Sequence, residues 1–277
     1  MIALSVGSTA LMIAVFLVAA CAGVGRNALR PASASGSTCQ NTGSPSKQHG
    51  NAALPIQRSL NEAAVRYGWP LLWDDEFTGT CLDQNRWRLY SGNSTGGVGE
   101  YMVSNVSTSR GILKITSHGD QSGGMAWRTG QRYGRWEIRV KAQSGNGYSP
   151  VVLLWPDAED WPEGGEIDFM EMPGGDRKVN YFTLHYGKND SQNEVPVSGD
   201  FTQWHNYAVE WAPNSITGFI DGRQIFNSTD KSEIPKGSMH LAIQQDIGPF
   251  NNWVPAQDAT TPPEVQLRVD WVRIYGP

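Results

Sequence analysis

The stretch GRWEIRVKA, residues 134–142, alternates apolar and charged side chains with a period of two. Its alternating members are Trp136, Glu137, Ile138, Arg139, Val140 and Lys141. Because successive side chains of a β-strand point to opposite faces, this pattern predicts a strand with one face on a core and one face in water.

Similar short segments, rich in β-branched and aromatic residues, recur along the rest of the chain between Gly, Asn, Asp and Pro. They are GILKITS (111–117), PVVLLW (150–155), VNYFTLHY (179–186), HNYAVEW (205–211), ITGFIDGRQIF (216–226), MHLAIQ (239–244) and QLRVDWVRIYG (266–276). Asp221-Gly222 between two apolar runs is typical of a two-residue hairpin turn. With no helices between these segments, we expect an all-β jelly-roll sandwich of two antiparallel sheets, and a barrel is the second choice.

Composition narrows the class of partner. The chain has 277 residues, a formal net charge of -5 and no run of Lys or Arg, so neither nucleic acid nor an anionic membrane surface is expected to bind it. Eleven Trp and nine Tyr offer aromatic faces that stack on sugar rings, which makes a polysaccharide the expected partner of a monomeric protein.

The amino terminus indicates export. Residues 1–21 are uncharged and mostly apolar, as in a signal segment, and Val18–Cys21 resembles the lipobox of bacterial lipoproteins. We therefore expect an extracellular or cell-envelope protein whose membrane contact is a lipid on Cys21. An ordinary signal peptide or a single membrane span is the alternative.

The remaining chain divides into a tether and a domain. Residues 22–58 are rich in Ser, Ala, Gly, Asn and Pro and predict a flexible tether, and residues 59–277 form the predicted catalytic domain. Ser59 and Glu62 have capping-box spacing, which predicts one short helix at the start of this domain.

Two cysteines remain if Cys21 carries a lipid. An exported compartment permits a disulfide, and we expect Cys39 to pair with Cys81. Two unpaired thiols are the alternative.

The stretch GGEIDFMEMPGG, residues 164–175, holds three acids among residues that look like core. In a regular strand Glu166 and Asp168 would share one face, and Glu171 would point the other way. One additional residue, a β-bulge at Phe169 or Met170, would turn Glu171 onto the face of the other two acids.

Carboxylates grouped in this way suit the hydrolysis of glycosides. That reaction needs two carboxyl groups beside the scissile bond, and neighbouring acids raise the pKa of one of them so that it stays protonated. A solvated acidic face or a set of calcium ligands is the other interpretation.

GGEIDFMEM resembles the E-x-D-x-x-E signature of glycoside hydrolase family 16, the group of laminarinases, lichenases, agarases and carrageenases. Other parts of the chain resemble the same family, in family order from about Trp73 to Tyr275. They are WDDEFTGTCLDQNRW (73–87), QRYGRWEIRVKAQSGNGYSPVVLLWP (131–156), WHNYAVEWAPNSITGFIDGRQI (204–225) and LRVDWVRIYG (267–276). The resemblance implies a β-jelly roll with a carbohydrate-binding cleft on its concave sheet.

By this resemblance Glu166 is the nucleophile, Glu171 the general acid/base and Asp168 the assisting carboxylate, with no cofactor in catalysis. The implied enzyme is a retaining endo-β-glycosidase, and the bulged signature favours β-1,3-glucan as its substrate. Mixed-linkage glucan, galactan or a bacterial exopolysaccharide, transglycosylation, and a non-catalytic glycan-binding jelly roll are the alternatives.

The resemblance also implies residues that contact the substrate, namely Arg128, Trp155, Trp161, His185 and Gln245. Asp270 matches a ligand of a structural calcium ion in several relatives. The segment VNYFTLHYGKNDSQNE, residues 179–194, departs from the typical laminarinase pattern and leaves the identity of the glycan open.

Overall fold

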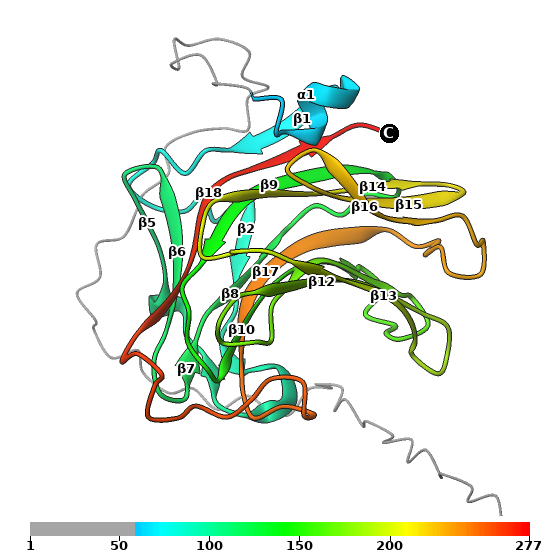
Figure 1. Ribbon diagram of the computed structural model, residues 1–277. Helices are drawn as coiled ribbons and strands as arrows, with labels where there is room; N and C mark the ends of the chain where they lie inside the picture. Colours follow the sequence, from blue (N-terminus) through cyan, green and yellow to red (C-terminus); the bar gives the residue numbers. More distant parts are fainter. Residues whose placement is uncertain (1–58) are drawn as a thin grey trace, which may run out of the picture. The chain divides into compact units, whose positions relative to one another are not determined.

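The computed structural model describes residues 59–277, which belong to one compact unit. Nearly every element is a strand (Figure 1). The elements are α1 (Ala63–Tyr67), β1 (Leu71–Asp75), β2 (Trp87–Leu89), β3 (Gly92–Asn93), η1 (Thr95–Gly97), β4 (Glu100–Tyr101), η2 (Val103–Asn105), β5 (Val106–Ser109), β6 (Ile112–Ser117), β7 (Gln121–Ser122), β8 (Gly124–Trp127), β9 (Gly134–Ala142), β10 (Tyr148–Pro156), β11 (Glu166–Glu171), β12 (Val179–Tyr186), β13 (Ser191–Ser198), β14 (His205–Ala212), β15 (Ser215–Ile220), β16 (Arg223–Ser228), β17 (Met239–Ile247) and β18 (Val265–Tyr275).

The strands form two large antiparallel sheets, which confirms the predicted jelly-roll sandwich. The eight-stranded sheet has the order β16-β15-β14-β9-β18-β6-β5, with β1 paired to β18. The seven-stranded sheet has the order β13-β12-β11-β10-β17-β8-β2. Figure 1 shows the two sheets one above the other. A three-stranded sheet, β3-β4-β7, completes the described strands.

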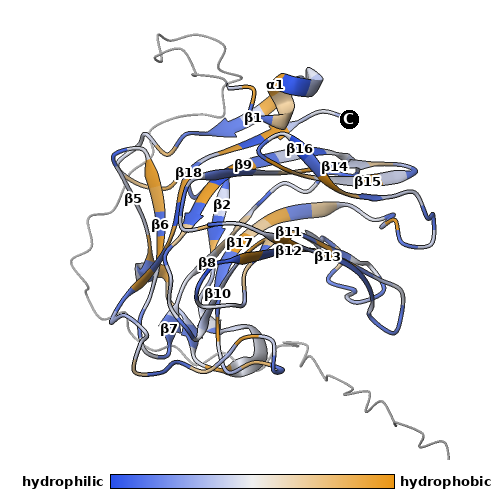
Figure 2. Ribbon diagram, in the orientation of Figure 1, coloured by the Kyte–Doolittle hydropathy of each residue, from blue (hydrophilic) through white to orange (hydrophobic). Residues whose placement is uncertain are grey.

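The main hydrophobic core fills the space between the two large sheets (Figure 2). Trp136, Ile138 and Val140 of β9 lie in this core, as their alternation predicted, and Ile167 and Phe169 of β11 reach it from the other sheet. Both sheets therefore have an inner face buried in this core and an outer face directed away from it.

The predicted hairpin joins β15 to β16. Asp221 and Gly222 have φ values of +49° and +67°, the pair of positive angles that a type I′ turn requires. Strands β9 and β12 also begin and end at the residues that the sequence indicated.

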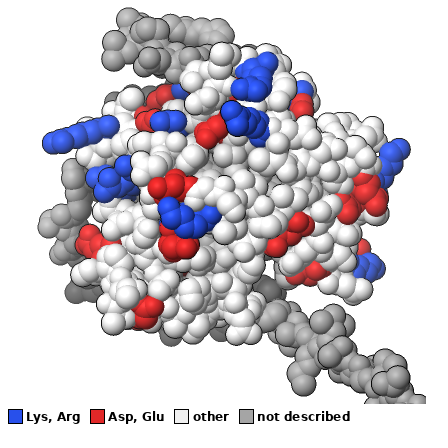
Figure 3. All heavy atoms as spheres, viewed as in Figure 1, with Lys and Arg blue, Asp and Glu red and all other residues white. Residues whose placement is uncertain are grey.

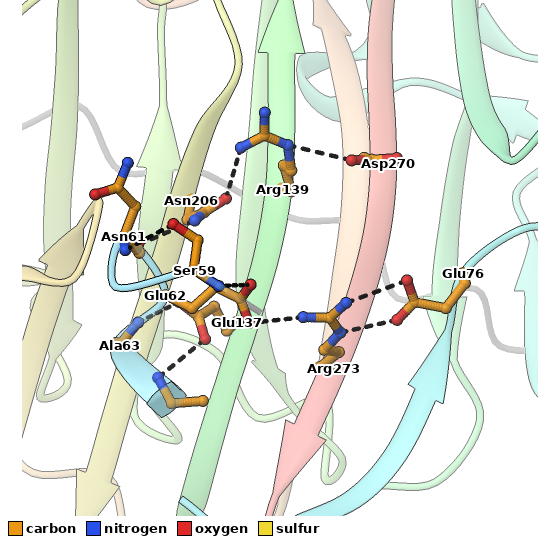
Figure 4. Close-up of polar contacts among 11 residues, drawn as sticks. Ser59, Asn61, Glu62, Ala63, Glu76, Glu137, Arg139, Asn206, Asp270 and Arg273 are labelled. Atoms are coloured by element: carbon orange, nitrogen blue, oxygen red, sulfur yellow. Dashed lines mark hydrogen bonds and ion pairs between the residues drawn. The ribbon is translucent and has the colours of Figure 1, made fainter. Parts of the chain in front are cut away.

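Glu137 is an exception to the predicted wet face of β9, because its side chain is only 1% exposed. Its carboxylate accepts hydrogen bonds from the backbone N–H groups of Ala63 (2.6 Å) and Ala64 (3.1 Å) (Figure 4). These are the first N–H groups of α1, and they lack partners within the helix. The helix thus covers this part of the sheet, which the alternation alone placed in water.

The predicted short helix exists, but its capping differs from a full capping box. Glu62 accepts a hydrogen bond from the Ser59 N–H (2.9 Å), whereas the Ser59 hydroxyl oxygen accepts one from Asn61 instead. Arg273 of β18 pairs with Glu62 (2.8 Å) and with Glu76 (2.8 Å), as Figure 4 shows. These buried ion pairs connect the helix to the sheet.

The predicted signal segment (1–21), the tether (22–58) and the lipidation site Cys21 lie outside the described residues. Cys81 takes part in a disulfide, and Cys39, its predicted partner, also lies outside the described part. Within residues 59–277, no helix combines the length and apolar character needed to cross a membrane.

Candidate active site

Strand β11 contains the predicted bulge. Along β10, Leu153 pairs with Asp168 and the adjacent Val152 pairs with Met170, so Phe169 is an additional residue on β11. Phe169 and Met170 are both fully buried in the core. The additional residue restores the phase of the strand beyond it, and Glu171 comes to the same face as Asp168.

This face points away from the core between the sheets. Glu171 pairs with Val151 and Asp168 with Leu153, and these two apolar residues form a separate small cluster with Ala242 of β17. Glu166 and Glu171 are partly exposed, whereas Asp168 is only 3% exposed. The outer face of the seven-stranded sheet therefore brings the three predicted acids together.

His185 of β12 lies opposite Glu166 and holds its ring between two carboxylates. Its Nε2 is 3.1 Å from Asp168 Oδ2, and its Nδ1 is 2.6 Å from Asp190 Oδ1. Burial alone would lower the pKa of His185, but the hydrogen bonds to Asp168 and Asp190 raise it to about 11. His185 is thus a buried cation beside the acids.

Glu166, Asp168 and His185 are the one group of metal-binding type among residues 59–277, with ligand atoms within 4.8 Å of one another. A His ligand must offer a neutral ring nitrogen with a free lone pair. Because both ring nitrogens of His185 face carboxylates, both carry protons and neither is available to a metal. The positive charge at this position is the imidazolium.

The surroundings of the Glu166 carboxyl group favour its protonated form. Burial and the nearby charge of Asp168 raise the pKa of Glu166 well above its ordinary value. Asp168 Oδ1 is buried and accepts no hydrogen bond from the described residues, and a proton on Glu166 that is donated to Asp168 would raise the pKa of Glu166 further. A proton on Glu166 would satisfy that oxygen.

Glu171 has a neighbour that the sequence analysis missed, Trp253 in the loop between β17 and β18. The Trp253 indole N–H donates a hydrogen bond to Glu171 Oε1 (2.5 Å), and its ring packs edge-on against Tyr181 at 4.7 Å. Burial and the charge of Asp168 raise the pKa of Glu171 to about 8, although the bond from Trp253 lowers it. An aromatic residue in the polar stretch FNNWVPA was the available signal.

Asp246 of β17 is a second missed residue near Glu171. It accepts hydrogen bonds from the Tyr101 hydroxyl (2.5 Å) and the Gln244 amide (2.9 Å). Burial raises the pKa of Asp246 to about 6, and these hydrogen bonds oppose the shift. Its charge also contributes to the raised pKa of Glu171.

Gln245 does not reach this face, and its predicted contact with substrate is corrected. It is fully buried, and its amide nitrogen donates to Ser117 and to the Val265 carbonyl oxygen (3.1 Å) on the other sheet. Gln244 and Asp246 point to the outer face instead. The prediction was one residue out of phase, and in a strand one residue exchanges the faces.

Trp155 and Trp161 lie together near His185. Their rings stack at 6.3 Å with an interplanar angle of 10°, and the Trp161 ring lies 6.4 Å from the His185 ring. Trp155 donates to Glu159 (2.8 Å), whereas the buried Trp161 Nε1 has no hydrogen-bond partner. The pair forms a partly exposed aromatic surface next to Glu166.

Arg128 directly follows a strand of the sheet that carries the acids, whereas Asp270 does not belong to that sheet. Arg128 is exposed just after β8, and its Nε donates to the Gln84 carbonyl oxygen (2.8 Å). Asp270 lies on the other large sheet, where it pairs with Arg139 (3.1 Å; Figure 4). Calcium takes six to eight oxygen ligands, and the Asp270 carboxylate is already bound to a guanidinium. The calcium ion stays a prediction.

Comparisons with known proteins agree with the sequence resemblance. The model of Glycosyl hydrolases family 16 matches residues 97–273. A β-glucanase of Rhodothermus marinus is 27% identical over 244 residues, covering 75% of this chain and 85% of that protein. The X-ray structure of the laminarinase from Rhodothermus marinus matches with a TM-score of 0.67 and 26% identity, covering 75% of this chain and 97% of that one.

The laminarinase catalytic domain of Thermotoga maritima MSB8 has the same fold, with a TM-score of 0.68 at 23% identity over 76% of this chain and 98% of that chain. The matched residues 97–273 run from the last residue of η1 into β18 and include the three acids of β11. Since this match spans more than half of the chain, the protein belongs to family 16 of the glycosyl hydrolases.

Proposed function

We propose that this glycoside hydrolase cleaves β-1,3-glucan internally, with retention of anomeric configuration, and that Glu166, Asp168 and Glu171 carry the reaction. The bulge at Phe169 is the observation that supports this assignment most strongly, because it brings Glu171 to the face of the other two acids. Retaining hydrolysis uses one carboxylate as nucleophile and a second, protonated carboxyl as acid.

In the first step Glu166 attacks the anomeric carbon while Glu171 protonates the departing glycosidic oxygen. The C–O bond to the leaving sugar breaks, and an ester between Glu166 and the glycosyl unit forms. A pKa of about 8 for Glu171, raised by burial and by Asp168, keeps this acid protonated at neutral pH.

In the second step Glu171, now ionised, removes a proton from water, which attacks the same carbon. The ester bond breaks, and Glu166 is released as a carboxylate. The Trp253 N–H that donates to Glu171 stabilises the ionised form that this step requires.

Asp168 and His185 control the charge of the nucleophile. Burial and the charge of Asp168 raise the pKa of Glu166, and Glu166 must lose its proton before it attacks the anomeric carbon. The His185 imidazolium, 3.1 Å from Asp168, offsets the negative charge that gathers in the cluster. Both residues therefore influence the ionisation of the nucleophile.

The substrate assignment draws on the relatives and on the aromatic surface. The relatives include proteins named β-glucanase and glucan endo-1,3-beta-glucosidase. Trp155 and Trp161 present stacked rings next to Glu166, where the apolar face of a glucose unit would pack.

The test incubates the purified protein with laminarin, lichenan, agarose, carrageenan and bacterial exopolysaccharides, followed by linkage analysis of the products. We expect oligosaccharides from laminarin, and an NMR time course should show β-configured reducing ends first. Cleavage of galactans alone would contradict the substrate, and α-configured first products would contradict the mechanism. Longer chains formed from short ones would indicate transglycosylation.

We further propose that the enzyme is exported and anchored through a lipid on Cys21. The apolar segment 1–21 and its Val18–Cys21 ending support this. Fatty-acid labelling should mark the full-length protein and not a Cys21→Ser variant. Equal labelling of the two proteins would contradict the lipid anchor. Non-reducing peptide mapping should find Cys81 joined to Cys39, and a different disulfide would contradict that pairing.

A further inference from the structure

Three basic side chains stand side by side on the outer face of the eight-stranded sheet. Lys141 of β9 pairs with Arg268 of β18, and Arg268 pairs with Lys114 of β6. Their chain neighbours Val140 and Leu267 are fully buried, so the three basic side chains point away from the core. We call Lys114, Arg268 and Lys141 the cationic row.

The cationic row lines a depression of about 320 Å³. Trp204, just before β14, stands at one end, with its ring 5.0 Å from the Lys141 ammonium. Arg110, in the turn between β5 and β6, adds a fourth cation at the other end. Basic side chains appear over β5 and β6 in Figure 3.

Nothing in residues 59–277 neutralises the cationic row. Like charges directly opposite one another destabilise a sheet, yet no ion pair involves any of its three members there. Asp270, an acid on the same strand as Arg268, is paired with Arg139. Arg268 donates only to the neutral Gln266 side chain (2.9 Å). The cationic row thus stays uncompensated by acids of the described residues, in a chain whose net charge is -5.

We propose that the cationic row and Trp204 form a second binding site, for an acidic polysaccharide. Neighbouring strands lie about 4.8 Å apart, so the row spans about 10 Å in a line. Anionic groups on successive sugars would pair with the cations, and the Trp204 ring would pack on a sugar face. The site lies on the sheet opposite Glu166, so it binds a glycan without cleaving it.

The shape and charge favour a glycan over other anionic partners. Four cations around one shallow depression are too few for the basic face of a nucleic-acid-binding protein. An open row with a flat aromatic ring at its end suits a linear chain of rings better than a compact ion. The inference does not depend on the proposed function, because it concerns binding and not turnover.

The test measures binding of the full-length protein to polygalacturonate, dextran sulfate and neutral dextran by affinity electrophoresis and calorimetry. We expect binding to the acidic polymers and not to dextran, and weaker binding at higher salt. The double variant Lys114→Gln/Arg268→Gln should bind about 10-fold more weakly, as expected for two lost charge contacts. Comparing carboxylated with sulfated polymer identifies the preferred anionic group.

Matched variants separate this site from general charge effects. Lys231→Gln/Lys236→Gln removes the same charge from exposed lysines elsewhere and should leave binding unchanged. Trp204→Ala should weaken binding without changing net charge, and both sets of variants should keep the wild-type rate on laminarin. An equal loss in the Lys231/Lys236 variant, or no binding of either acidic polymer, overturns the proposal. Binding of phosphatidylglycerol vesicles in place of polysaccharide would reassign the row to membranes.

Discussion

Trp253 donates its indole N–H to Glu171 over 2.5 Å, although 82 residues separate the two in the chain. The bond stabilises the ionised form of Glu171, while burial and Asp168 disfavour that form. The protonation of the proposed acid/base is therefore set by one loop and one strand that meet only in the folded protein.

Removal of the hydrogen bond from Trp253 to Glu171 should move the basic limb of the pH profile to higher pH. In Trp253→Phe the ring that packs on Tyr181 remains, but the carboxylate loses its donor, so the pKa of Glu171 rises. Because Glu171 must be protonated for the first step, the basic limb of kcat/KM should move up by about one pH unit. Trp204→Phe, on the other sheet, should leave the limb in place, and a downward shift in Trp253→Phe would contradict the role of Glu171.

The two glutamates can be distinguished by chemical rescue. Glu166→Ala should abolish turnover, and azide should restore it with inverted products, because the anion attacks from the vacated face. Glu171→Ala should lower the rate on polysaccharide by about 100- to 10,000-fold. This variant should still react with activated leaving groups and give a glycosyl azide of retained configuration. Inverted azide products from Glu171→Ala would exchange the two assignments.

Substitutions of Asp168 and His185 should move the acidic limb of the pH profile of kcat/KM in opposite directions. The charge of Asp168 raises the pKa of Glu166, so Asp168→Asn should shift this limb to lower pH. The His185 cation lowers the pKa of Glu166, so His185→Gln should shift it to higher pH. We expect shifts of about one unit, measured from kcat/KM between pH 3 and 9. Shifts of the same sign would reject this electrostatic account.

Glu137 should make the folded protein less stable as the pH rises. Burial raises its pKa from 4.5 to about 7, so between these values the folded state keeps a proton that the unfolded chain has released. Stability then falls with increasing pH, by on the order of 3 kcal/mol in total. Glu137→Gln removes this titration, although it loses one hydrogen bond to α1.

Urea unfolding at pH 5 and pH 8 measures this effect. The free energy of unfolding of the wild type minus that of Glu137→Gln should be larger at pH 5 than at pH 8. A difference that does not change with pH would show that Glu137 is ionised in the folded protein throughout this range.

The sequence predicted the features that depend on local pattern. The alternation in β9, the Asp221-Gly222 turn and the bulge at Phe169 all follow from side-chain period and turn chemistry, and the structure confirms them. The prediction for Gln245 failed because a shift of one residue in a strand exchanges its faces.

Other features depend on contacts between distant segments. In the sequence, Glu137 is only a charged residue within a strand pattern. Its burial depends on N–H groups from a helix that begins 74 residues earlier in the chain. Trp253 lies in an irregular loop, whose position no periodicity gives. The cationic row joins three strands far apart in the sequence, each with a single basic side chain at the relevant position.

The attachment of α1 determines where proteolytic shedding could release an intact domain. A cut on the carboxyl side of Glu62 would take a carboxylate from the buried Arg273 and expose the donors that Glu137 binds. The buried Arg273 would keep Glu76 as its only remaining carboxylate, and loss of one partner of a buried ion pair destabilises a fold. Cleavage that leaves the domain intact would therefore have to fall before Ser59.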